Sequence, residues 1–123
     1  MHILLVDDNH DIVRLVEQVL QLEGHKVSTA RDGMEALQQA ASGHPDAVVL
    51  DINMPGMEGW EVCRRIKQQY HIPVMMLTVR ADKADLQHGA AVGADAYLLK
   101  PFDIPVFLDH LNTMLGLAYG QTR

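Results

Sequence analysis

The sequence contains one cysteine, Cys63, so the chain cannot form an internal disulfide, a thiolate zinc cluster or a redox pair. We therefore expect a reducing, cytoplasmic setting. Long apolar runs are also missing: the run nearest the N-terminus, residues 3–6, is too short for a signal peptide or a membrane span. With 123 residues, the chain must be stabilised by a packed core, which a single domain of this length can bury.

Positive charge is scarce, because 10 Lys and Arg residues face 16 Asp and Glu residues and give a formal net charge of -6 at pH 7. Nucleic-acid surfaces need clustered Lys and Arg, so we expect no direct nucleic-acid binding. The seven histidines are scattered and show no spacing typical of metal ligands. The net charge does not indicate the role of the Asp and Glu residues, so we consider their positions in the sequence.

Short apolar runs alternate with helical patterns along the chain, without a linker or an internal repeat. Apolar runs predict strands at residues 3–6, 47–50, 73–78 and 96–99, and a further strand is predicted at residues 26–30. Apolar side chains at helical spacing predict helices at residues 12–20, 34–41, 60–70, 84–92 and 104–115. Gly89 weakens the fourth of these patterns. The alternation predicts an α/β fold, a parallel sheet with helices on both faces.

Polar residues lie at the carboxyl ends of four predicted strands: Asp7 and Asp8, Asp51, Thr78 and Lys100. In an open α/β sheet, the ligand crevice lies beyond the carboxyl ends of the strands. Neighbouring carboxylates repel one another, so a cluster of three needs a cation. Ligands that are all oxygen select a hard ion, and a site with few protein ligands suits Mg²⁺ better than Ca²⁺.

Five segments resemble, in order and spacing, the receiver domain of two-component response regulators. They are residues 4–8 (LLVDD), 30–37 (ARDGMEAL), 51–59 (DINMPGMEG), 73–78 (PVMMLT) and 93–102 (GADAYLLKPF). The resemblance implies a doubly wound, CheY-like five-stranded parallel sheet in the order 2-1-3-4-5. It also implies a receiver domain over residues 1–118, with 119–123 as a tail or the start of a linker.

The resemblance implies that Asp51 accepts a phosphoryl group from a sensor histidine kinase or phosphotransfer protein, as an acyl phosphate. Asp7, Asp8, Asp51 and the backbone carbonyl of Asn53 would bind Mg²⁺. Lys100 would pair with Asp51 and then with the phosphoryl group. The domain would be a regulatory phosphoacceptor that catalyses only its own phosphotransfer and dephosphorylation, rather than an enzyme.

Thr78 and Tyr97 would form the switch. By resemblance, the Thr78 hydroxyl would donate to a phosphoryl oxygen, and Tyr97 would rotate inward behind it. This would change the surface of residues 84–92, 96–99 and 104–115, which would contact an output protein or domain. A cis Lys100–Pro101 bond is expected as well.

Three residues are expected to tune the site. Val79 stands where the family usually has Ala or Gly, so its bulk would crowd the mouth of the site. Asn53 and Arg80 flank the path of the hydrolytic water in the family and would set the lifetime of the phosphoryl group. Residues 104–115 contain no arginine, which argues against the salt-bridged dimer of the DNA-binding subfamily, although a phosphorylation-dependent homodimer stays open.

Several alternatives remain. Taken singly, acids at strand ends also suit helix N-termini and turns. The chain could be the receiver half of a DNA-binding transcriptional regulator, or a receiver-like module that binds partners without phosphorylation. A Mg²⁺-dependent aspartyl phosphohydrolase is less favoured, because that family has D-x-D early in the chain together with a cap domain. Walker, G-x-S-x-G, G-x-G-x-x-G and H-E-x-x-H motifs are absent.

Overall fold

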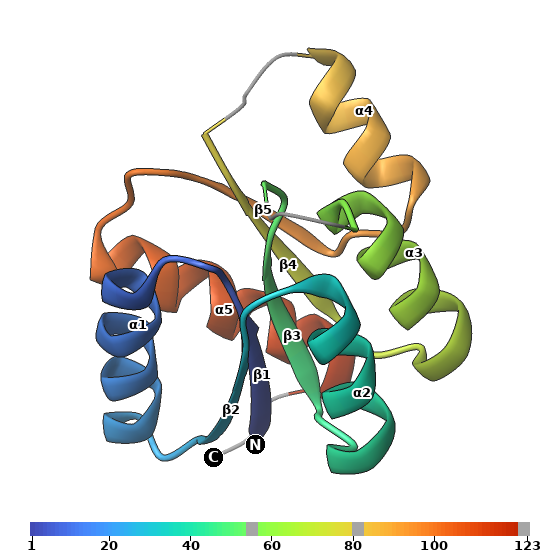
Figure 1. Cartoon of the computed structure of the whole chain (residues 1–123). Helices are drawn as coiled ribbons and strands as arrows, with labels where there is room; N and C mark the ends of the chain where they lie inside the picture. The colour runs from blue at the N-terminus through green and yellow to red at the C-terminus, as the bar shows by residue number, and fades with distance from the viewer. Residues whose placement is uncertain (54–56, 80–82, 121–123) are drawn as a thin grey trace.

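Five parallel strands form one sheet in the order β2-β1-β3-β4-β5 (Figure 1). This order and the parallel pairing confirm the predicted fold. The strands are β1 (His2–Val6), β2 (Lys26–Ala30), β3 (Ala47–Asp51), β4 (Val74–Thr78) and β5 (Ala96–Leu99). The computed structural model describes residues 1–53, 57–79 and 83–120. Arg80, for which a tuning role is predicted, lies outside them.

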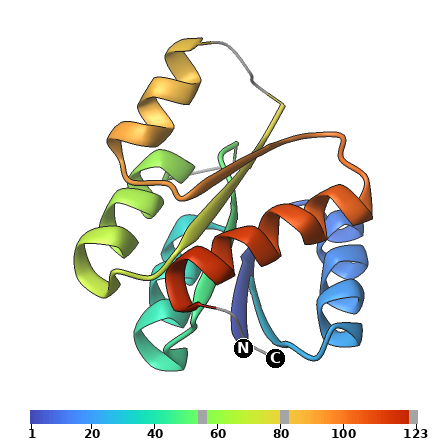
Figure 2. The same cartoon turned by 180° about the vertical axis from the view of Figure 1, so that it is seen from behind.

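Helices cover both faces of the sheet (Figures 1 and 2). They are α1 (His10–Leu22), α2 (Gly33–Gly43), α3 (Gly59–Tyr70), α4 (Lys83–Ala91) and α5 (Ile104–Tyr119). One core lies between the sheet and α1 and α5, and the other lies between the sheet and α2 and α3. Successive strand residues point to opposite faces, so Ile3 and Leu5 enter the first core while Leu4 and Val6 enter the second. A strand buried on both sides must be apolar throughout, which explains the uninterrupted apolar runs.

Several helix ends follow from local signals. The side chain of Asn9 caps α1 by accepting from the backbone N–H groups of Asp11, at 2.9 Å, and Ile12, at 3.2 Å. Asp32 caps α2 in the same way through Glu35 N–H, at 2.8 Å. α5 continues to Tyr119, beyond the predicted end of its apolar stripe. The Lys100–Pro101 bond is cis, as expected.

Cys63 is fully buried in α3 and belongs to the core between the sheet and α2 and α3. Burial raises the pKa of its thiol to about 12, so the thiolate that reacts with electrophiles is not formed at neutral pH. Among the helices that the structure describes, none has the length and hydropathy of a membrane span.

Candidate functional site

Three aspartates meet at the carboxyl edge of the sheet. Asp7 and Asp8 follow β1, and Asp51 ends β3, the neighbouring strand. Because Val6 and Leu50 are register partners, the residues after them lie side by side. One carboxylate oxygen from each aspartate lies within 4.8 Å of the others. Asp7 and Asp51 are buried and Asp8 is exposed, so the cluster opens to solvent on one side.

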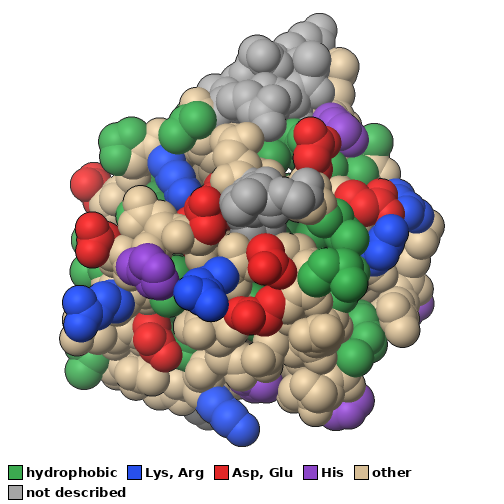
Figure 3. Space-filling view, viewed as in Figure 1, with side chains coloured by type: hydrophobic (Ala, Val, Ile, Leu, Met, Phe, Trp, Pro, Cys, Tyr) green, Lys and Arg blue, Asp and Glu red, His purple; other side chains and the backbone are tan. Residues whose placement is uncertain are grey.

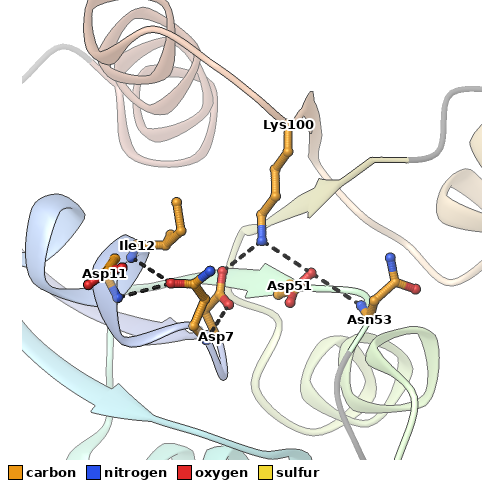
Figure 4. Close-up of polar contacts among 7 residues, drawn as sticks. Asp7, Asp11, Ile12, Asp51, Asn53 and Lys100 are labelled. Carbon is orange, nitrogen blue, oxygen red and sulfur yellow. Dashed lines mark hydrogen bonds and ion pairs between the residues drawn. The ribbon is translucent and has the colours of Figure 1, made fainter.

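Lys100 reaches into this cluster from the loop after β5 (Figure 4). Its Nζ lies 2.9 Å from Asp7 Oδ2 and 3.6 Å from Asp51 Oδ1. The shorter ion pair is therefore with Asp7, and the contact with Asp51 that the resemblance implied is the longer one. The backbone N–H of Lys100 donates to the carbonyl of Thr78, at 2.7 Å, which ties the lysine to the end of β4.

Backbone donors orient the two buried carboxylates. Asn53 N–H donates to Asp51 Oδ1 at 3.2 Å (Figure 4). Asn9 N–H donates to Asp7 Oδ1 at 3.0 Å. Asn9 thus both holds Asp7 and caps α1, a role that the sequence analysis did not assign to it. The signal was present, because an asparagine directly before a helical pattern is typical of an N-cap.

The pKa of Asp51 is raised from 3.8 to about 6. Burial is the main cause, since it penalises the charged carboxylate, and the charges of Asp7 and Asp8 act in the same direction. Lys100 and the Asn53 N–H oppose this rise by favouring the ionised form. Among the residues that the structure describes, the cluster therefore brings three carboxylates together with one ammonium group. A divalent cation held by oxygen ligands fits this donor set.

The structure places the other predicted site residues along β4 and β5. Thr78 ends β4 at the same sheet edge and is fully buried, while Val79 after it is 66% exposed. Tyr97 lies on β5, paired in register with Met76, and its ring stacks on Trp60 with the ring centroids 6.4 Å apart. Thr78 therefore lies at the cluster's edge of the sheet, and Tyr97 lies further back under α4.

A further residue missed by the sequence analysis is Gly59, the first residue of α3. Its N–H donates to the carbonyl of Ile52 at 3.1 Å. A Cβ at this position would lie 2.6 Å from Ile52 Cα and 2.8 Å from the Asp51 carbonyl oxygen. Glycine thus allows α3 to begin against the backbone of Asp51, and this fixes where its carboxylate emerges.

Charged side chains are mixed on the face seen in Figure 3, where Lys and Arg side chains alternate with Asp and Glu side chains. On that face, the described basic residues form no continuous stripe of the kind that tracks a phosphate backbone. This distribution agrees with the acidic net charge of the sequence.

Comparison with known proteins gives a consistent result. The family model for the response regulator receiver domain matches residues 3–112. The response regulator ArlR of Staphylococcus aureus is 37% identical over 113 residues, which are 92% of this chain and 52% of that protein. The chain thus spans about half the length of this curated relative.

Two solved structures extend this similarity. The chemotaxis response regulator CheY4 of Vibrio cholerae is 38% identical, with a TM-score of 0.88 over 93% of this chain and 98% of that one. A putative response regulator from Chloroflexus aurantiacus is 34% identical, with a TM-score of 0.86 over 94% of this chain and 97% of that one.

Proposed function

The chain belongs to the response regulator receiver domain family, and from this premise we propose that Asp51 accepts a phosphoryl group from a sensor histidine kinase or phosphotransfer protein. The observation that carries the proposal is the convergence of Asp7, Asp8, Asp51 and Lys100 at one sheet edge. A carboxylate nucleophile beside other acids and one lysine suits phosphoryl transfer, which depends on positioning and charge neutralisation. Among the described residues, these four supply both.

In the proposed reaction, an Asp51 oxygen forms a bond to phosphorus while the bond between phosphorus and the donor histidine nitrogen breaks. The product is an acyl phosphate, and the donor ring, which carries a proton on its other nitrogen, leaves as neutral imidazole. Asp7, Asp8, Asp51 and the backbone carbonyl of Asn53 would hold Mg²⁺, which when bound neutralises negative charge on the phosphoryl oxygens. Lys100 favours the ionised, nucleophilic form of Asp51 and lies close enough to bind the new oxygens.

The added phosphoryl group carries about -1.5 to -2 charges and strong acceptor oxygens. We propose that Thr78 and Lys100 bind these oxygens and that Tyr97 responds, so that the surface of α4, β5 and α5 contacts an output protein or domain. Hydrolysis of the acyl phosphate by the domain itself, tuned by Asn53, would end the signal. We expect the domain to act in the cytoplasm and to leave any contact with nucleic acid to its partner.

Labelling tests the proposal. The native chain, incubated with Mg²⁺ and either acetyl phosphate or a phosphorylated histidine kinase, is expected to gain the mass of one phosphoryl group. Asp51→Asn should show no gain, and chelating the metal should suppress it in the native chain. Asp109→Asn, which removes the same charge from the exposed side of α5, is the control and should label normally. A native chain that stays unlabelled while another receiver labels would point to a module that binds without phosphorylation.

Val79 is expected to slow phosphorylation by small donors. Its exposed side chain directly follows the buried Thr78, so it occupies space at the mouth of the site. Val79→Ala should therefore gain the phosphoryl group from acetyl phosphate faster than the native chain, in a time course of intact mass. Val106→Ala trims another exposed valine, on α5, and should leave the rate unchanged. Equal rates for Val79→Ala and the native chain would contradict this assignment.

A further inference from the structure

Trp60, the only tryptophan of the chain, joins three elements through stacked rings. It is the second residue of α3 and is 5% exposed. The His88 ring of α4 stacks on it with centroids 4.3 Å apart and planes at 16°. The Tyr97 ring of β5 stacks on it with centroids 6.4 Å apart and planes at 24°. The Trp60–Tyr97 distance lies within the range typical of interacting aromatic pairs, and the Trp60–His88 distance lies just below it.

The stack is tightly built at Gly89 of α4. A Cβ there would lie 3.1 Å from Tyr97 Cε2 and 3.3 Å from Trp60 Cζ3. Glycine thus brings the backbone of α4 against both rings, which explains why the helix tolerates it. If either ring moves, the backbone of α4 must therefore move with it.

At its other end, the stack is connected to the phosphoacceptor segment. Trp60 directly follows Gly59, whose backbone lies against the backbone of Asp51 and Ile52. A shift of that segment is passed to the start of α3, because the close approach leaves no free space to absorb it. Trp60 thus directly follows the residue that contacts the Asp51 backbone. Its own ring contacts the rings of His88 in α4 and Tyr97 in β5.

We propose that Trp60 is a positioning residue for Tyr97. Through the stacked rings, Trp60 would transmit the phosphorylation state of Asp51 to α4 and β5. The inference rests on the proposed phosphorylation of Asp51. His88 closes the stack from the exposed side of α4 and holds the indole between two elements. The surface formed by α4 and β5 is thereby coupled to Asp51 through α3. This coupling would act in addition to any coupling through Thr78.

Emission from the single tryptophan reads this stack directly. Phosphorylation of the native chain should change Trp60 emission, and Asp51→Asn treated in the same way should show no change. His88→Ala uncovers one face of the indole, so its emission should shift to longer wavelength and iodide should quench it more strongly. If neither phosphorylation nor His88→Ala changed the emission, the proposal that the ring stack responds to the phosphorylation of Asp51 would be contradicted.

The decisive experiment compares amide hydrogen exchange over residues 87–99 before and after phosphorylation, with the phosphoryl mass gain measured on the same samples. The native chain and Trp60→Phe, which keeps a ring, should show a phosphorylation-induced change in exchange. Trp60→Leu should label equally but lose that change, and so should Gly89→Ala, whose methyl group pushes on both rings. Thermal unfolding of each variant verifies that it is folded under the conditions used.

The outcomes separate the two proposals. An unaltered change in exchange in Trp60→Leu and Gly89→Ala, at equal labelling, would overturn the role of Trp60 and leave the phosphoacceptor role intact. Absence of any mass gain in the native chain would instead refute the phosphoacceptor role, and with it the premise of this inference.

Discussion

Gly59→Ala is expected to lower the free energy of unfolding by roughly 1–3 kcal/mol, the usual cost of overpacking a close contact. The new Cβ would lie 2.6 Å from Ile52 Cα and 2.8 Å from the Asp51 carbonyl oxygen. Both are backbone atoms and cannot rotate away, so α3 or the end of β3 must move. Because Asp51 lies on the displaced segment, phosphorylation from acetyl phosphate should slow as well. Urea unfolding and the time course of mass gain measure the two effects.

Gly116→Ala is the matched control. Gly116 also lies in a helix, α5, but a Cβ there would meet no atom within 4 Å. The same methyl group should therefore stabilise the chain by about 0.5–1 kcal/mol, because alanine favours the helix over glycine, and should leave labelling unchanged. If both variants were as stable as the native chain and labelled alike, the close approach of α3 to Asp51 would have no energetic consequence.

Much of the fold could be predicted from the sequence because its signals are local. Strands buried on both faces read as apolar runs, which is why β1, β3 and β4 could be located. The edge strands β2 and β5 are less buried, and they were predicted with their observed bounds. The predicted strand at residues 73–78 begins instead at Val74, because Pro73 has no N–H to give to a strand ladder. Asp7 and Asp51 could be placed at one edge from strand ends alone, since parallel strands share their carboxyl edge.

The detail of the site could not be predicted in the same way, because it depends on distances between segments far apart in the chain. Lys100 and Asp7 are 93 positions apart, and only the packed structure makes their ion pair shorter than the one with Asp51. The fit of Gly59 against β3 and of Gly89 against two rings likewise has no counterpart in residue spacing. A glycine read alone indicates a turn or a weak helix, and its use for close approach appears only in three dimensions.

Asp51→Asn is expected to stabilise the unphosphorylated chain while it abolishes labelling. In the native fold, burial and two neighbouring acids disfavour the charged form of Asp51, as its raised pKa shows. Asparagine removes that charge and keeps an oxygen that can accept the N–H of Asn53. A pKa of about 6 instead of 3.8 corresponds to about 3 kcal/mol at high pH, at about 1.4 kcal/mol per unit. We therefore expect the native residue to make the fold less stable, as for a group retained for its chemistry.

The sign and pH window of this gain follow from the same pKa. Below 3.8, Asp51 is protonated in both the folded and unfolded states, so asparagine should bring no advantage. As pH rises, the unfolded chain loses the proton first, so the stability contributed by protonated Asp51 is lost until the folded group ionises near pH 6. The difference in free energy of unfolding between Asp51→Asn and native should therefore grow from pH 4 to 6 and stay constant above about 7. Urea titrations across this range, each corrected by Asp109→Asn for the loss of one charge, measure it. A gain that is independent of pH would show that the buried carboxylate is not its source.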